Sequence, residues 1–190
     1  MKGARLKHTI RLLLCRSDKQ RSKYLKDNNI FYHMGDNVSL NIKVLPLYAK
    51  LISFGSNIKV ATGVTFITHD VMAMVFNNCS DYEYAENIGC IDIRDNCFIG
   101  AKSILMPGIS IGPNAIVAAG AIVTHDVPPG EIWGGCPARC IGYFDEYMKK
   151  YKGVCEKKKG FEDCSSEVIS QKRVEQEWTF FNKCHNQLDR

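Results

Sequence analysis

Two histidine–aspartate pairs are the residues of this chain whose types and spacing suit proton transfer. The tetrapeptide Thr-His-Asp-Val occurs at residues 68–71 and again at residues 124–127. An imidazole titrates near neutral pH and can accept a proton from an attacking hydroxyl or amine. The two copies are therefore alternative positions for a general base, and the surrounding sequence has to distinguish them.

A six-residue repeat surrounds both copies. From Ile93 the first residue of each hexad is aliphatic: Ile93, Ile99, Leu105, Ile111, Val117 and Val123. The fifth residue is small or β-branched: Cys97, Ser103, Ile109, Ala115, Ala121 and Val127. Six is neither the period of an α-helix nor that of a plain strand, but it fits a short strand followed by a turn. Three such faces close one coil, and coils stack as parallel strands. The sequence therefore predicts a parallel β-helix.

The same rhythm returns upstream and is interrupted twice. Its first positions are Phe54, Val60 and Phe66, with fainter copies starting at Met34 and Leu40. The phase shifts between Leu40 and Phe54, which predicts an irregular bend near residues 46–53. The pattern also stops after Val71 and resumes near Ile91, and a long loop in a regular solenoid, here residues 71–90, more often carries function than not.

These features resemble a known family. The hexads, and the closing stretch from Pro107-Gly108 through "VTHDVPPGEIWGGCPARCIGYFDEYMKKY", are similar to the hexapeptide-repeat acyltransferases, in the branch of maltose, galactoside and polysaccharide O-acetyltransferases. The resemblance covers roughly residues 34–151. It implies an all-β fold, a left-handed parallel β-helix with N-terminal and C-terminal helices. The left-handed winding comes from the resemblance alone, because parallel crossovers are otherwise right-handed.

The resemblance also implies a reaction. Members of the family are homotrimers that transfer the acetyl group of acetyl-CoA, here to a hydroxyl of a sugar or glycan precursor. Their general base lies just before a protruding loop, which is the position of His69. Asp70 and a backbone carbonyl are alternative partners for orienting its ring. His125 is the third residue of its hexad rather than the fourth, at a position where the family usually has lysine near acetyl-CoA.

Site residues follow from the same resemblance. The cofactor-binding residues expected from the family pattern are Ala101, Ala119, Thr124, His125 and Arg139. The small residues would form a smooth wall for the pantetheine arm, and Arg139 would neutralise a CoA phosphate. Plain solenoid packing is the alternative explanation for the alanines, and Gly142 stands where some relatives have a second basic residue. The residues able to contact a sugar acceptor are Asp70, just before the 71–90 loop, and Asn77, Asn78, Asp81, Tyr82 and Tyr84 within it.

Other functions remain open at this level. An N-acetyltransferase acting on an amino sugar or nucleotide sugar, or a xenobiotic O-acetyltransferase, would use the same base and cofactor. A zinc hydratase on the same β-helix would need three histidines, whereas the repeat offers only His69 and His125, so no metal is expected. A non-enzymatic scaffold is the remaining alternative.

The positive charge of the chain is concentrated at its N-terminus. The net charge is +5, yet residues 1–26 hold nine Lys or Arg and only one acid. No nucleic-acid-binding module accompanies this segment, so no nucleic-acid partner is expected. The apolar run at residues 12–15 is far shorter than the ~20 residues that span a bilayer, and no secretory signal is recognisable. A cytoplasmic location is the expectation.

Three domains are predicted: an N-terminal helix (1–30), the β-helix (31–142) and a C-terminal helical extension (143–190). Residues 4–27 are predicted to form one basic amphipathic helix that caps the end of the β-helix through Leu6, Ile10, Leu13 and Leu14. An anionic membrane surface is the alternative partner for residues 1–26. The extension is predicted to contain a helix at residues 143–152, a Lys-rich linker at 156–160 and a helix from Ser165 or Ser166 to about Lys183.

Overall fold

The computed structural model describes residues 2–163 and 169–185 of the chain. The chain forms two compact units, Met1–Tyr147 and Met148–Arg190, and the division falls within helix α4 (Phe144–Lys157).

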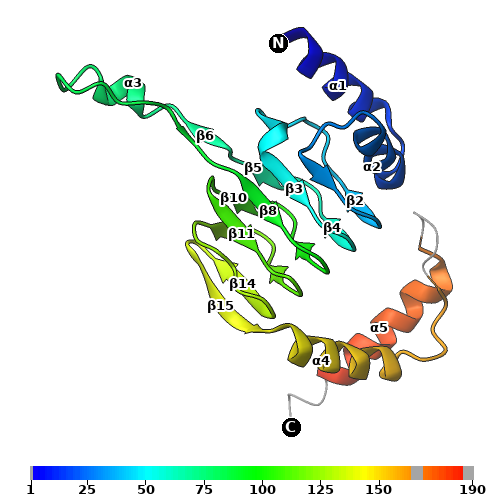
Figure 1. The fold of residues 1–190 in the computed structure, drawn as a ribbon. Helices are drawn as coiled ribbons and strands as arrows, with labels where there is room; N and C mark the ends of the chain where they lie inside the picture. The colour runs from blue at the N-terminus through cyan, green and yellow to red at the C-terminus, as the bar shows by residue number, and fades with distance from the viewer. Residues whose placement is uncertain (1, 164–168, 186–190) are drawn as a thin grey trace. The chain divides into compact units, whose positions relative to one another are not determined.

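Unit 1 is built on a coil of short strands that form three parallel sheets (Figure 1). Sheet A contains β1(His33–Met34), β3(Ile52–Phe54), β8(Ile91–Ile93) and β11(Ile109–Ile111). Sheet B contains β2(Val38–Leu40), β4(Ile58–Val60), β9(Phe98–Ile99), β12(Ile116–Val117), β14(Glu131–Gly135) and β15(Ala138–Tyr143). Sheet C contains β5(Thr65–Phe66), β10(Ile104–Leu105) and β13(Ile122–Val123). The chain passes through A, B and C in turn, except that the first circuit has no strand in sheet C, and β15 ends the coil by pairing antiparallel with β14.

The predicted hexad register is confirmed. Equivalent first positions pair across successive coils, as in Ile93 with Ile111 and Leu105 with Val123. All six first positions and all six fifth positions between Ile93 and Val127 are buried. One aliphatic side chain per face therefore points into the coil, and the small fifth-position residues fill the space beside it.

A column of asparagines forms the corner between sheets A and B. Asn37, Asn57, Asn96 and Asn114 occupy the fourth positions of their hexads, and each has a positive φ, between 53° and 58°. Their side chains bond in series, with Nδ2 of Asn57 donating to Oδ1 of Asn96 at 2.8 Å and Nδ2 of Asn96 to Oδ1 of Asn114 at 2.9 Å. Asparagine tolerates the left-handed region better than most residues, so this choice fixes a tight turn in each coil.

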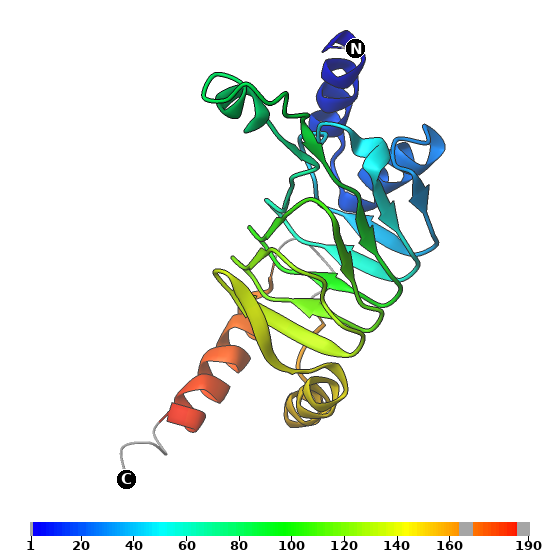
Figure 2. The same ribbon diagram turned by 60° about the vertical axis from the view of Figure 1, so that its left-hand side comes forward.

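The two interruptions of the repeat have distinct structures. Residues 41–51, which include the 3-10 helix η1(Ala49–Leu51), replace the third strand of the first coil, in agreement with the predicted bend. The 71–90 loop is a projecting arm in Figures 1 and 2. Its base is an antiparallel pair, β6(His69–Asp70) with β7(Asn87–Ile88), and its outer part contains α3(Ala73–Phe76).

The prediction of one N-terminal helix was wrong. The segment forms α1(Lys2–Leu14) and α2(Asp18–Asp27), because the Ser17 side chain accepts a hydrogen bond from the Gln20 N–H and caps the second helix. The predicted apolar stripe was also wrong. The break turns Leu12 into the core with 0% exposure, and the side chains of Leu6, Ile10, Leu13 and Leu14 are 49–68% exposed.

The described part of unit 2 contains the α4 residues from Met148 onward and α5(Gln171–His185). Within it, Phe161 packs against Phe180 with ring centroids 6.2 Å apart, and Lys158 and Arg173 both contact the Glu177 carboxylate. Helix α4 runs to Lys157, so the first residues of the predicted linker are helical. The predicted start of the last helix, at Ser165 or Ser166, lies outside the described residues.

Candidate active site

The two histidines lie at the same corner of the coil, the one that leads from sheet C to sheet A. Phe66 pairs with Leu105, and Leu105 pairs with Val123, so the residues that follow these strands are stacked above one another. His69 comes three residues after Phe66, whereas His125 comes two after Val123. The two histidines are thus two coils apart, about 10 Å at the ~4.8 Å spacing of stacked strands, and differ in phase by one residue.

His69 is packed on one side and open on the other. It is paired with Ile88 in the base of the arm, and the Tyr48 ring meets it edge to face at 5.0 Å between centroids. Its Nδ1 atom is buried and has no hydrogen-bond partner among the described residues. This arrangement leaves Nε2 as the ring nitrogen that can meet a substrate.

A pocket of about 330 Å³ opens beside His69, which forms part of its wall. The strand β5 and the residues after it line one side, and residues 44–47 line the other. The Thr68 hydroxyl donates to the Leu47 carbonyl at 2.8 Å and holds these two sides together. Arg5 from α1 completes the lining and donates from Nε to the Leu45 carbonyl at 3.0 Å. This pocket was not predicted from the sequence, and neither was the role of α1 in it.

Tyr48 is a second feature that the sequence did not indicate. Its φ is 52°, in the left-handed region that bulky residues rarely occupy. Such strain persists only where surrounding contacts hold it, and it occurs often at functional sites. Here the strained backbone places the aromatic ring against His69. The one available sequence signal was the loss of phase near residues 46–53, which marks a bend but does not identify the residue.

The arm residues predicted to contact an acceptor mostly bond to other residues of the arm. The Asp70 carboxylate accepts from the Asn87 side chain at 2.8 Å and from the Met72 N–H at 3.1 Å, and these bonds hold its pKa below the usual aspartate range. It makes no hydrogen bond to His69 in the described structure. Asn77 exchanges two hydrogen bonds with the backbone of Tyr84.

The outer part of the arm is aromatic and exposed. The rings of Tyr82 and Tyr84 lie 4.8 Å apart, and Phe76 contacts Tyr84 at 5.3 Å. Asn78 caps α3 through a bond to the Met74 carbonyl, and Asp81 is exposed. Within the described unit 1, none of the arm residues beyond His69 lines the pocket beside it.

The residues predicted to bind the cofactor fall on two corners. Ala101 and Ala119 are stacked at the corner between sheets B and C, where the Gly120 N–H donates to the Ala101 carbonyl at 2.8 Å. Arg139 lies beside this column, because it pairs with Gly134, where an added Cβ would lie 3.2 Å from the Ala118 Cβ. Gly100 in the same column has no room for a side chain, since an added Cβ would lie 2.4 Å from the Ala119 nitrogen.

Thr124 and His125 lie at the other edge of sheet C. Both are exposed, and the Thr124 hydroxyl is 2.8 Å from Nδ1 of His125. The outer face of sheet C lies between the two corners and carries the half-buried side chains of Ile104 and Ile122. The predicted cofactor residues thus bracket one partly apolar face.

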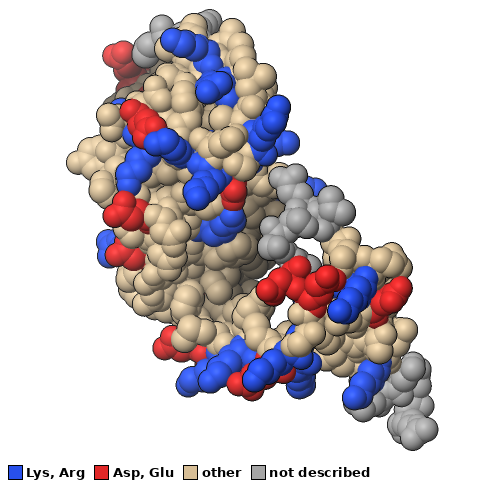
Figure 3. Space-filling view, turned by 90° about the vertical axis from the view of Figure 1, so that its right-hand side faces the viewer, with Lys and Arg blue, Asp and Glu red and all other residues tan. Residues whose placement is uncertain are grey.

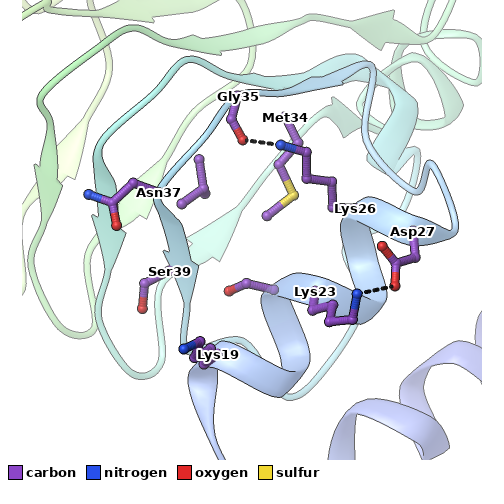
Figure 4. A pocket seen from close by; sticks show the side chains of 10 residues that line it. Lys19, Lys23, Lys26, Asp27, Met34, Gly35, Asn37 and Ser39 are labelled. Atoms are coloured by element: carbon purple, nitrogen blue, oxygen red, sulfur yellow. Dashed lines mark hydrogen bonds and ion pairs between the residues drawn. The ribbon is translucent and has the colours of Figure 1, made fainter.

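A larger hollow, about 540 Å³, lies between α2 and the first coil (Figure 4). Its lysines are mostly paired: Lys26 bonds to the Gly35 carbonyl and to Asp36, and Lys23 forms an ion pair with Asp27. Figure 3 views the side where α1 and α2 lie and shows basic side chains gathered there. This hollow is at the corner between sheets A and B, away from both histidines.

Three further properties of residues 2–163 and 169–185 concern possible metal-ligand clusters, the buried thiol and the length and apolarity of the helices. Across these residues no group of three or more His, Cys, Asp or Glu is placed to hold a metal ion. Burial raises the pKa of Cys97 to about 11, so this thiol stays protonated at neutral pH. None of the helices in these ranges is long and apolar enough to cross a membrane.

Comparison with known proteins shows the family. The family model for the hexapeptide repeat of succinyl-transferase matches residues 91–125. YvoF of Bacillus subtilis (strain 168), which is named as an acetyltransferase, is 32% identical over 125 residues, which is 65% of this chain and 67% of YvoF. The galactoside O-acetyltransferase of Escherichia coli (strain K12) is 31% identical over 63% of this chain. That match spans 60% of the Escherichia coli enzyme, less than two thirds of its length.

Solved structures share the fold. A maltose O-acetyltransferase from Clostridium difficile 630 superposes with a TM-score of 0.58 at 24% identity, over 74% of this chain and 84% of that one. A hexapeptide-repeat acetyltransferase from Vibrio cholerae O1 biovar eltor, solved with acetyl coenzyme A, gives a TM-score of 0.52 at 21% identity, over 73% and 84% of the two chains. These neighbours imply a left-handed winding for the coil. The helices at both ends are substantial, so the term all-β describes the coil rather than the whole chain. With the confirmed hexads and the identity to YvoF over two thirds of its length, the chain belongs to the hexapeptide-repeat acetyltransferase family.

Proposed function

We propose that the protein transfers the acetyl group of acetyl-CoA to a hydroxyl of a sugar or glycan precursor, with His69 as the general base. The observation that carries the proposal is the environment of His69. One ring nitrogen is buried, the ring is packed against Tyr48, and the residue forms part of the wall of a pocket at the base of the arm. A fixed imidazole beside a pocket is what base catalysis requires.

In the proposed reaction, Nε2 of His69 removes the proton of the acceptor hydroxyl as its oxygen attacks the thioester carbonyl carbon. The tetrahedral intermediate then collapses, the carbon–sulfur bond breaks, and the proton passes from Nε2 to the departing CoA sulfur. Nδ1 would carry the proton of the neutral ring. Asp70 is bonded within the arm and does not hold Nδ1, which is buried without a hydrogen-bond partner in the described structure, so the packing against Tyr48 would orient the ring.

The donor would lie along the outer face of sheet C. Ala101 and Ala119 on one edge and Thr124 and His125 on the other would form the walls for the pantetheine arm. Arg139 at the end of the alanine column would bind a CoA phosphate. The acetyl-CoA held by the structural neighbour from Vibrio cholerae supports this choice of donor.

A homotrimer completes the proposal. The arm exposes Val71, Met72, Met74 and Val75 to between 54% and 69% of their maximum, which is unusual for so many neighbouring apolar side chains. Packing of the arm against an adjacent subunit would cover them and place its polar residues, such as Asp81 and Tyr82, near a neighbouring site.

The test supplies acetyl-CoA with a panel of neutral sugars, amino sugars, nucleotide sugars and sugar acids, and follows release of the CoA thiol. Amino sugars separate N-acetylation from O-acetylation. Calorimetry with acetyl-CoA gives a readout that does not depend on the acceptor. Thiol release with a hydroxyl acceptor is the expected result, and the absence of both turnover and acetyl-CoA binding would contradict the proposal.

A further inference from the structure

The pocket beside His69 has an uneven distribution of polarity. Most of its wall is apolar, with Leu45, Pro46 and Phe66 among its members, and Thr65 and Thr68 supply hydroxyl groups. Arg5 is the charged residue of this lining, and no Asp or Glu takes part in it. A neutral sugar has no charge to pair with a guanidinium, and a smaller polar side chain could bind its hydroxyl groups equally well.

The Arg5 side chain is held in a definite way. Its Nε donates to the Leu45 carbonyl at 3.0 Å, and the Leu45 N–H in turn is 3.4 Å from the Thr9 hydroxyl on the same helix. These contacts tie α1 to the pocket segment. Neither Nη1 nor Nη2 of Arg5 has a partner in the described part of the chain. The side chain is therefore attached to residue 45 through Nε, while its two terminal nitrogens keep free N–H donors. A guanidinium anchored through Nε still presents two N–H groups that match a carboxylate or phosphate.

The residues around the pocket do not neutralise this charge. The carboxylate nearest to His69 in the sequence is that of Asp70, which already accepts hydrogen bonds from Asn87 and Met72. Lys7 and Arg11 on α1 add positive charge to the same helix. An anionic group that enters the pocket would therefore meet a positive potential and no competing acid.

From these contacts we infer that the acceptor carries an acidic group, a carboxylate or a phosphate, and that Arg5 binds it while His69 activates a hydroxyl on the same molecule. This inference rests on the proposed function and makes it more specific. Arg5 is a specificity-determining residue in this account and takes no part in the proton transfer. The alternative is that Arg5 only fastens α1 to residues 44–47, in which case its loss would affect every acceptor alike.

The test compares acceptors that differ in charge at one position: glucose, glucuronic acid and glucose 6-phosphate, and galactose, galacturonic acid and galactose 6-phosphate. Their affinities are measured by ligand-observed NMR titration, and kcat and KM are measured by thiol release. The variant is Arg5→Met, and the matched control is Lys7→Met, which makes the same charge change on the same helix outside the pocket.

In the wild-type protein and in Lys7→Met, at least one acidic sugar should bind more tightly than its neutral counterpart. Arg5→Met should weaken that acidic sugar by about 10- to 100-fold, through KM rather than kcat, and change the neutral one less than about 3-fold. Equal affinity for acidic and neutral sugars in the wild type overturns the inference, and so does an equal loss for both in Arg5→Met. The NMR titration distinguishes these results even if no sugar is acetylated. A lack of acetylation with every sugar would count against the proposed function and not against this inference.

Discussion

The two Thr-His-Asp-Val segments are identical in sequence and lie at the same corner of the β-helix, yet their surroundings differ. The imidazole of His69 is packed against Tyr48, has one nitrogen buried, and belongs to the wall of a pocket. The imidazole of His125 is exposed, and the hydrogen-bond partner shown for it is the hydroxyl of its neighbour Thr124.

The aspartates differ in the same way. Asp70 bonds to Asn87 across the base of the arm, whereas Asp126 accepts from the Ser110 N–H of the coil beside it at 2.7 Å. One segment therefore opens the coil into an arm and the other continues it. A tetrapeptide acquires its role from its phase in the repeat and from what packs on it, so identity over four residues says little about function.

The largest expected effect comes from the first histidine. His69→Ala should lower kcat for acetyl transfer by about 10²- to 10⁴-fold, the usual contribution of a general base. The fold should be unaffected, because His69 is only half-buried and its corner is held by the backbone bond from Gly89 to Thr68. Thiol release at saturating substrates measures the loss, and a thermal melt confirms folding. A decrease of less than about 10-fold would mean that the two corners are not functionally distinct.

Tyr48 provides a sharper test of what distinguishes the corners. Tyr48→Gly removes the ring that packs on His69, and glycine accepts the positive φ of this position without strain. We expect kcat to fall by about 10-fold because the imidazole is no longer held in place, while the melting temperature stays the same or rises.

Tyr48→Phe is the matched control, because it keeps the ring and removes only the hydroxyl. It should retain kcat within about 2-fold of the wild type. If the phenylalanine variant is as impaired as the glycine variant, the hydroxyl rather than the packing matters, and the account of Tyr48 is wrong.

The aspartates should differ in their effect on the arm. Because the pKa of Asp70 is lower in the folded protein than in the unfolded chain, its contribution is complete above about pH 4 and is lost as the pH falls through the folded-state value. Amide protection of Ile88, in the base of the arm, should therefore decrease at acidic pH. Asn87→Ala should reduce this protection several-fold at pH 7, because it removes the side-chain donor that bonds to the Asp70 carboxylate.

Asp126→Asn is the control at the other corner. It weakens the bond to Ser110 and should leave the protection of Ile88 unchanged. Equal loss of arm protection in both variants would show that the corners are coupled.

The smallest effect is expected for the second histidine. His125→Ala should raise KM for acetyl-CoA by about 2- to 5-fold and leave kcat nearly unchanged, since an exposed imidazole can contribute at most a hydrogen bond or a weak contact to the donor. Steady-state kinetics with varied acetyl-CoA measure this change. A large decrease in kcat would indicate that His125 takes part in the proton transfer, which would contradict our assignment of His69 as the base.

The sequence was informative where the structure repeats. Burial of the first and fifth hexad positions, the bend after Leu40 and the loop after Val71 all follow from residues close together in the chain. The break between the first two helices was also readable, because Ser17 and Gln20 have the spacing of a capping box, but the apolar residues on both sides suggested continuity.

The contacts that shape the pocket were beyond such reasoning. Arg5 meets Leu45, and Thr68 meets Leu47, through bonds that join residues 40 and 21 positions apart and belong to no period. The side of α1 that faces the core depends on where the helix ends and how α2 turns back. Only the folded chain shows that Leu12 is buried and that Arg5 reaches His69's pocket.

The pH dependence of kcat/KM tests the central claim, that His69 and not His125 is the base. The profile should show an acid limb, because a protonated base cannot accept the substrate proton. We predict that His125→Ala keeps this limb and that the residual activity of His69→Ala lacks it. A limb that survives in His69→Ala and disappears in His125→Ala would contradict the account.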